Sequence, residues 1–193
     1  MRLNEKIQIV NHHPEWIYDY FEEVEMLRRK PALSTMAYEH IGSTSIPNIK
    51  AKPIIDIIIG VESFPPADDV VLELEQSGYT FMKEMSVADR FYFIKRGDKH
   101  FNVHVISYKG TIWNNDILFR NYLINHPDEA QKYSSLKEQI VSSGVETLLE
   151  YSEKKKDFIL DIYEKIRRCY DSHLKEESNE ANKKDSLCAR SQS

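Results

Sequence analysis

The stretch His40-Ile-Gly-Ser-Thr-Ser-Ile-Pro-Asn-Ile-Lys-Ala-Lys-Pro-Ile-Ile-Asp-Ile-Ile-Ile-Gly-Val61 decides the fold of this chain. It joins a loop of small, hydroxyl-bearing residues to an isoleucine-rich run that contains one carboxylate, Asp56. Burying an unpaired carboxylate costs several kcal/mol, so a chain that places one in an apolar strand is expected to supply a partner. A ligand, a metal ion or a cationic side chain would meet that need. Asp56 is therefore the first candidate functional residue.

The residues on either side of the loop predict strands. β-branched apolar residues dominate 53–61, and 36–41 forms the strand before the loop. Farther along, 90–96 and 100–107 are joined by a Gly-Asp turn, which predicts a β-hairpin.

Helices are expected before, between and after these strands. Apolar residues recur at helical spacing over 14–30, where Pro31 ends the pattern. The same kind of pattern predicts further helices over 68–77, 113–125, 127–143 and 146–170. The predicted fold class is α+β (mixed α/β), with a small mixed sheet flanked by helices and helices at the C-terminal end.

The composition predicts one domain with a short tail. The chain has 193 residues, of which 41% are hydrophobic and 11% aromatic, as is ordinary for a globular protein that buries one core. Residues 1–171 are expected to form that single domain. From 172 to 193 the chain is rich in Lys, Glu, Asn and Ser, which predicts a disordered charged tail.

Charge and hydropathy exclude some classes of partner. The net charge of −5 offers no electrostatic basis for general nucleic-acid binding or for binding to anionic membranes. No stretch approaches the roughly 20 apolar residues that span a bilayer, and the N-terminus lacks the apolar region of a signal peptide. With two cysteines outside any metal-ligand spacing, a cytoplasmic location is expected.

The loop Gly42-Ser43-Thr44-Ser45 is suited to holding phosphate. Glycine allows the backbone to approach a ligand closely, while hydroxyls and exposed amides bind phosphate oxygens. The alternative is a plain turn between two strands, because these residue types are also typical of turns.

The position of Asp56 in this strand predicts a metal site that lacks its second carboxylate. Residues 54, 56 and 58 share one face of a strand, and a two-metal clamp would need a second carboxylate at position 58. That position holds Ile58. The alternative is a structural carboxylate that pairs with Lys52, His104 or a backbone donor.

His104 shares a strand face with His100 and Asn102. Its imidazole suits a metal ligand or a general base, and the alternative is a half-buried residue with a structural hydrogen bond. Six cations are candidate phosphate partners: Lys50, Lys52, Arg90, Arg120, Lys137 and Lys155. Arg120 is favoured because its neighbours are apolar and aromatic, whereas a lysine taken singly is more often solvated surface.

Residues 39–47 and 51–57 together resemble the signature of the GrpB family, which is grouped with the nucleotidyltransferase superfamily and occurs fused to dephospho-CoA kinase in some bacteria. The resemblance extends over roughly residues 7–166. It continues through Asn102-Val103-His104-Val105, Phe119-Arg120-Asn121-Tyr122-Leu123, His126-Pro127-Asp128-Glu129-Ala130 and Tyr151 with Lys155.

This resemblance implies a nucleotidyltransferase-like fold in which Gly42 and Ser43 hold phosphate and Asp56 binds Mg²⁺. The second carboxylate of the superfamily falls at Ile58, and His104 stands in the place of the third. Asn102 and Asn121 also depart from the residues common in the family.

Three functions follow as hypotheses. The first is an enzyme that transfers a nucleotidyl or related phosphoryl group from an NTP, with Ser43, Thr44, Lys52 and Arg120 on phosphates and Asp56 and His104 as catalytic residues or metal ligands. The second is a non-catalytic module that binds a nucleotide or phosphorylated metabolite. The third is a purely structural or interaction domain. Ile58 weighs against the first, because phosphoryl transfer depends on cations that offset developing charge.

Overall fold

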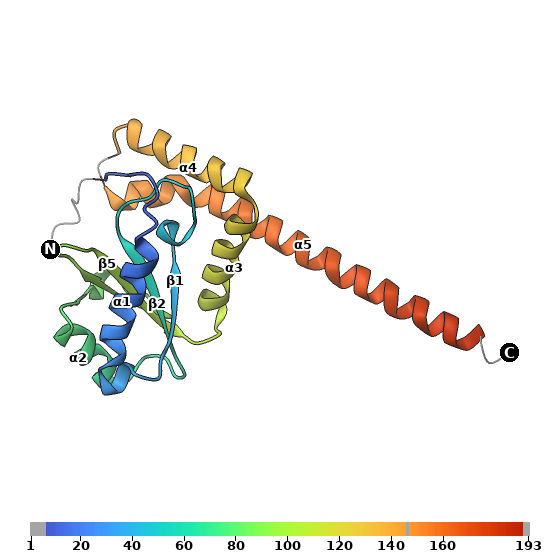
Figure 1. Cartoon of the computed structure of the whole chain (residues 1–193), viewed down its shortest axis with the longest axis horizontal. Coiled ribbons are helices and arrows are strands. Elements are labelled where there is room, and N and C mark those ends of the chain that lie inside the picture. The colour runs from blue at the N-terminus through green and yellow to red at the C-terminus, as the bar shows by residue number, and fades with distance from the viewer. Residues whose placement is uncertain (1–6, 146, 191–193) are drawn as a thin grey trace.

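The fold is known from a computed structural model that describes residues 7–145 and 147–190, with side chains described as far as residue 170. Its centre is a five-stranded sheet in the order β1-β2-β5-β4-β3 (Figure 1). The strands are β1 (Ala37–Ile41), β2 (Ile55–Val61), β3 (Thr80–Phe81), β4 (Arg90–Lys95) and β5 (Phe101–Ser107). The pair β2–β5 is parallel and the other neighbours are antiparallel, so the sheet is mixed.

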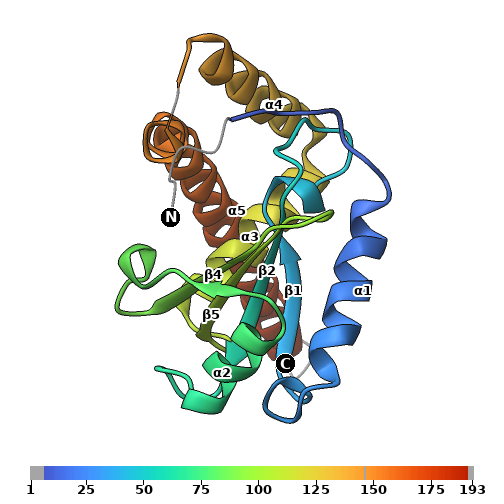
Figure 2. The same cartoon turned by 90° about the vertical axis from the view of Figure 1, so that its left-hand side faces the viewer.

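Helices cover both faces of the sheet (Figure 2). They are α1 (Trp16–Arg28), α2 (Asp68–Gln76), α3 (Thr111–Asn125), α4 (Pro127–Ser142) and α5 (Leu148–Arg190). The predicted α+β class with C-terminal helices is confirmed. Apart from the end of the last helix, the predicted helices and strands agree with these bounds to within about two residues.

The main core lies between α1, α2 and one face of the sheet. Alternate strand residues such as Ile57 on β2 and Val103 on β5 pack there against Leu27 of α1 and Leu74 of α2, and all four side chains are fully buried. Period-two alternation sends the intervening residues to the opposite face, which α3 and α5 cover. This second face carries the candidate functional residues.

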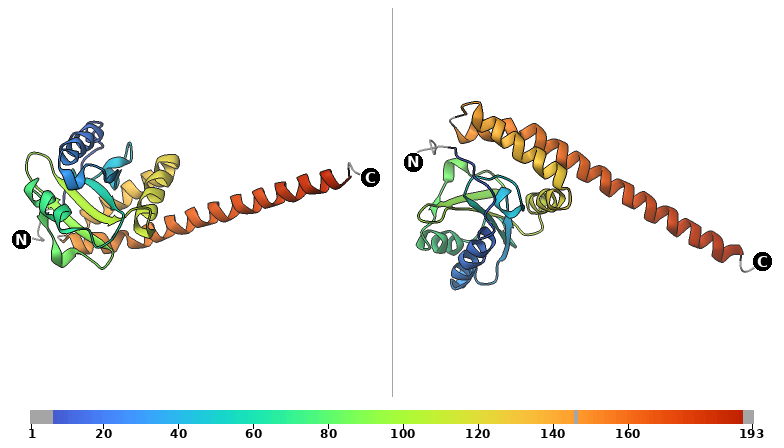
Figure 3. Two further views of the ribbon diagram at one scale, coloured as in Figure 1. Left: turned by 90° about the horizontal axis from the view of Figure 1, so that it is seen from below. Right: turned by 45° about the horizontal axis from the view of Figure 1, so that its top comes forward.

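Helix α5 runs alongside α3 and α4 and then continues beyond the body of the molecule (Figure 3). The sequence predicts a disordered tail from residue 172, whereas the structure continues α5 as a helix to Arg190. The division into a domain over 1–171 and a tail stays a prediction. Within the described residues, none of the helices has the length and apolar character that a membrane span requires.

Candidate functional site

Polar side chains from three neighbouring strands meet on the second face of the sheet. In the parallel pair β2–β5, Asp56 lies opposite Asn102. In the antiparallel pair β4–β5, Tyr92 lies opposite His104, and Arg90 is two residues before Tyr92 on the same strand. Side chains alternate along a strand, so all of these residues project from one face. The predicted shared face of Asn102 and His104 is confirmed.

Asp56 lies at the centre of this group. Its Oδ1 accepts a hydrogen bond of 2.7 Å from the Asn102 side-chain amide, and His104 Nε2 lies 3.9 Å away, an ion-pair distance too long for a hydrogen bond. Burial raises the pKa of Asp56, but His104, the Asn102 amide and the charge of Lys52 together hold that pKa below its ordinary value. Asp56 is therefore ionised at neutral pH.

The glycine of the loop lies directly against this carboxylate. Gly42 has φ +70° and ψ −172°, a conformation that residues with a side chain rarely adopt. A Cβ at Gly42 would lie 3.0 Å from the Asp56 Cβ and still closer to its Oδ2. The loop and the carboxylate can approach this closely only because residue 42 is glycine.

The hydroxyls of the loop have different uses. The buried Thr44 hydroxyl is 2.9 Å from His40 Nε2, and the Ser45 hydroxyl donates to the Gly42 carbonyl at 2.6 Å. Burial lowers the pKa of His40 to about 4, so this ring is neutral at physiological pH. These two hydroxyls therefore organise the loop, whereas the Ser43 hydroxyl lines the cavity and hydrogen-bonds to the Tyr133 side chain there.

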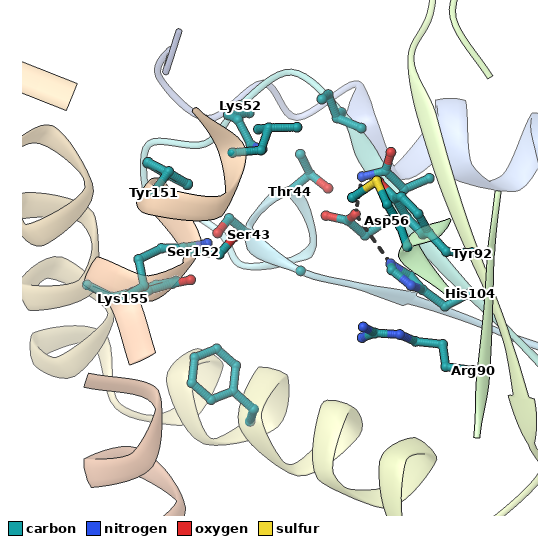
Figure 4. Close-up of a pocket in the computed structure, with 17 residues that line it drawn as sticks. Ser43, Thr44, Lys52, Asp56, Arg90, Tyr92, His104, Tyr151, Ser152 and Lys155 are labelled. Carbon is teal, nitrogen blue, oxygen red and sulfur yellow. Dashed lines mark hydrogen bonds and ion pairs between the residues drawn. The ribbon is translucent and has the colours of Figure 1, made fainter. Parts of the chain in front are cut away.

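The loop and the sheet face form one wall of a cavity of about 350 Å³ (Figure 4). Arg90 and His104 reach into the cavity from the sheet, while Ser152 and Lys155 enter it from α5 on the other side. Lys52, from the segment before β2, is the third cation of the lining. Among the lining residues, all of which the structure describes, Asp56 is the one carboxylate, so the cavity has an excess of positive charge.

Tyr151 of α5 brings two of these lysines together. Lys52 Nζ lies 5.3 Å and Lys155 Nζ 4.5 Å from the centre of the Tyr151 ring, within the range of cation–π contacts. Burial lowers the pKa of Lys155, and the Asp56 carboxylate opposes that shift. A lysine held in this way is ready to bind an anion, because its ammonium group is already partly desolvated.

The residues present fit one magnesium ion better than two. Ile58 is 0% exposed and packs in the core against α3, so a second carboxylate of an Asp-x-Asp clamp is missing from β2. No cluster of three or more His, Cys, Asp or Glu side chains able to bind a metal occurs in the described part of the chain. Mg²⁺ often takes one or two carboxylates and completes its shell with water and ligand phosphates, an arrangement that Asp56 suits. His104 is the poorer partner, because Mg²⁺ prefers oxygen ligands.

Some residues at this site were not among the predicted site residues. Tyr133, Tyr151 and Ser152 line the cavity; the two tyrosines belong to the family resemblance, and helical spacing also fits a core position for Tyr133. Asp116 on α3 interacts electrostatically with His104 and Asp56, and burial raises its pKa. Its position three residues after the buried Trp113 could have placed it on the sheet-facing side of α3.

Arg120 lies apart from this cavity. Its Nη1 donates to Glu39 Oε2 at 2.6 Å and to the His40 carbonyl at 2.8 Å, which ties α3 to β1. The structure therefore brings together Gly42, Ser43, Thr44, Lys52, Asp56 and His104 of the predicted site residues and places Arg120 elsewhere.

The Arg120→Ala variant is expected to lose about 1–2 kcal/mol of unfolding free energy, because it removes charge-assisted hydrogen bonds at a partly exposed site. Urea denaturation measures this loss. Phosphate-ligand binding should stay as in the wild type, and a matching loss of binding at unchanged stability would instead assign Arg120 to the ligand.

Comparison with known proteins identifies relatives over most of the chain. The family model described as GrpB protein matches residues 6–165. The UPF0157 protein YqkA of Bacillus subtilis is 34% identical over 84% of this chain and 48% of its own length. The glutamate-rich protein GrpB of Alkalihalophilus pseudofirmus is 31% identical over 81% of this chain and 94% of its own. The chain thus spans about half the length of YqkA but nearly all of the Alkalihalophilus protein.

A solved structure shares this architecture. The crystal structure of the conserved protein GrpB from Enterococcus faecalis matches with a TM-score of 0.74 and 32% identity. The match covers 84% of this chain and 99% of that one. The strands and helices that build the cavity are therefore those of a fold already seen by crystallography.

Proposed function

This chain belongs to the GrpB family, and from that premise we propose that its cavity binds the phosphate groups of a nucleoside triphosphate or a phosphorylated metabolite. The observation that carries the proposal is the convergence of Lys52, Arg90 and Lys155 on a cavity whose lining holds one carboxylate, Asp56. Lys and Arg are the natural partners of phosphate, and their charges offset those of the anion.

The Gly42–Ser43 loop supports the same ligand. Its glycine lets the chain pass close to Asp56, and Ser43 offers a hydroxyl to the cavity opposite Lys155 (Figure 4). A phosphate placed here would meet a hydroxyl donor and ammonium groups from separate elements. Convergent polar groups of this kind are typical of small-molecule sites.

We further propose that one Mg²⁺ accompanies the ligand. Asp56 would hold it through a carboxylate oxygen, and phosphate oxygens and water would complete its shell. When bound, the ion would offset negative charge on the phosphates. Asn102 and His104 keep Asp56 ionised and oriented for this role.

Two activities remain as candidates at this site. Nucleotidyl or phosphoryl transfer is the enzymatic candidate, in which His104 beside Asp56 would serve as the general base. Binding without catalysis is the second candidate, favoured by the buried Ile58, which deprives β2 of the second carboxylate of a metal clamp.

The test is a thermal-shift and calorimetric screen of nucleoside triphosphates, pyrophosphate and inorganic phosphate, each with and without Mg²⁺. A ligand at about 100 times its Kd should stabilise the wild type by roughly 2.7 kcal/mol. Asp56→Asn should lose the Mg²⁺-dependent part of that shift. Lys155→Gln should weaken binding by about tenfold or more, because it removes a charge-assisted contact.

Lys156→Gln is the matched control, since the exposed Lys156 lies next in the same helix and pairs with Glu153 at 3.2 Å. Its ligand affinity should equal that of the wild type. Binding that needs no Mg²⁺ but is lost in Ser43→Ala would favour the non-catalytic module. If none of the phosphate ligands stabilises the wild type, the proposed function is wrong.

A further inference from the structure

A second cavity adjoins the first. It has a volume of about 370 Å³ and shares Lys52, Ile54 and Leu148 with the cavity described above. The shared residues come from the segment before β2 and from the start of α5. A ligand that extends past Lys52 would therefore pass from one cavity into the other.

The lining of this second cavity combines apolar side chains with polar, mostly basic ones. Ile7, Pro53, Ile54 and Leu148 supply apolar surface. Lys52, Arg96 and His100 supply positive or protonatable groups, and Gln8 supplies a neutral amide; the lining residues that the structure describes include no Asp or Glu. An occupant that combines an apolar body with an anionic group matches both kinds.

Arg96 links the second cavity to the carboxylate of the first. Its Nη2 donates to the Asn102 side-chain oxygen at 3.0 Å, and its Nη1 donates to the main-chain carbonyl of Phe101 at 2.8 Å. Asn102 in turn donates to Asp56 at 2.7 Å. The guanidinium group thus fixes which way the Asn102 amide points, so that its nitrogen faces Asp56.

We propose that the second cavity is a subsite for a phosphomonoester with an apolar body, bound beside the ligand of the first cavity. The apolar body lies on Ile7, Pro53 and Leu148, and the phosphate lies toward Lys52, Arg96 and His100. This proposal rests on the proposed function, because the ligand of the first cavity is the phosphate ligand proposed above. The site would then take two phosphorylated ligands that meet at Lys52.

The arrangement also predicts that the two ligands influence each other. Lys52 lines both cavities, and the path from Arg96 through Asn102 to Asp56 consists of two hydrogen bonds. An anion beside Arg96 alters the electrostatic field at Asp56. Asp56 is the residue proposed to hold the Mg²⁺ that accompanies the ligand of the first cavity. By thermodynamic linkage, each ligand must change the affinity of the other by the same factor.

The test uses phenyl phosphate as probe and methyl NMR of the full chain labelled at isoleucine and methionine. Ile7 reports on the second cavity, Met85 on the first, and Ile54 on both. With the first cavity saturated by pyrophosphate, phenyl phosphate should shift the Ile7 and Ile54 signals and leave Met85 unchanged. Inorganic phosphate should bind the second cavity more weakly than phenyl phosphate, because it lacks the apolar body.

His100→Ala should weaken phenyl phosphate binding at Ile7 by about threefold or more, through loss of a donor to the anion. His126→Ala is its matched control, because His126 is also exposed and lies outside both cavities. The subsite is refuted if phenyl phosphate moves Met85 and not Ile7, if it shifts neither methyl, or if His100→Ala binds as the wild type does.

The two proposals fail in different ways. If pyrophosphate leaves Met85 unmoved while phenyl phosphate shifts Ile7, the proposed function is wrong and a phosphate site exists at the second cavity by itself. If pyrophosphate shifts Met85 but phenyl phosphate leaves Ile7 unmoved, the first site stands and the subsite does not.

Discussion

Replacing Gly42 by alanine is expected to lower the free energy of unfolding by about 3 kcal/mol or more and to abolish phosphate-ligand binding. The first cause is backbone strain, because φ +70° with ψ near 180° is essentially a glycine conformation. The second cause is overlap with the Asp56 carboxylate, which typically costs a further 1–3 kcal/mol in a packed site. Relief of the overlap would displace Asp56 from its hydrogen bond with Asn102.

Urea denaturation and the ligand-induced thermal shift measure these two effects. Gly97→Ala is the matched control, since a Cβ at Gly97 meets nothing within 4 Å. It should stay within about 0.5 kcal/mol of the wild type, as surface substitutions usually do. A Gly42→Ala protein with wild-type stability and wild-type ligand binding would show that the loop is not tightly packed on Asp56.

The second prediction concerns Lys137, whose replacement by methionine is expected to remove a rise of stability with pH. Lys137 is 1% exposed, donates a hydrogen bond to the Lys50 carbonyl, and places its Nζ 4.5 Å from the centre of the Tyr133 ring. Burial, and secondarily the nearby Lys155 charge, lower its pKa to about 7. Lys137 therefore loses its proton at a lower pH in the folded protein than in the unfolded chain.

The sign follows from proton linkage. Between about pH 7 and pH 10 the unfolded chain holds the Lys137 proton and the folded protein does not, so unfolding takes up a proton and stability rises with pH. The full slope is about 1.4 kcal/mol per pH unit, and a gain of about 3 kcal/mol is expected from pH 7 to pH 9.5 relative to Lys137→Met. Below the folded-state pKa the buried lysine carries its charge, and there Lys137 lowers the free energy of unfolding the most.

Denaturation curves at a series of pH values measure this difference. Lys132→Met serves as the control on the same helix, because Lys132 is exposed and pairs with Glu129 at 2.8 Å. Its pH dependence should follow that of the wild type. Parallel curves for the wild type and Lys137→Met would mean that Lys137 keeps an ordinary pKa inside the folded protein.

The strands and helices of this protein could be predicted from local patterns. Period-two alternation placed Asn102 and His104 on one face, and the isoleucine-rich run was a strand with Asp56 inside it. The short β3 was missed, because two residues carry no detectable period. For the C-terminal end, the charged composition predicts disorder, whereas the structure continues α5 as a helix to Arg190.

The composition of the cavity could not be predicted in the same way. Six cations were candidates, and only their tertiary contacts separate Lys155, which enters the cavity, from Arg120, which holds Glu39. Both lie on helices and both have aromatic neighbours in the sequence. The two residues differ in whether their side of the helix faces the cavity. This orientation depends on how α3, α4 and α5 pack against one another.

The sequence by itself determined the mixed fold, the placement of a glycine loop shortly before the strand that carries Asp56, and the absence of a second carboxylate at Ile58. These features depend on residue type and local spacing, which short-range sterics and side-chain periodicity translate directly into structure. The tertiary structure alone decided that the β2–β5 register sets Asn102 beside Asp56, and that α5 brings Lys155 to Ser43. The physical reason is that the charged side chains of the cavity come from strands and helices that are far apart in the sequence. Only the packing of these elements determines which charged groups lie close together.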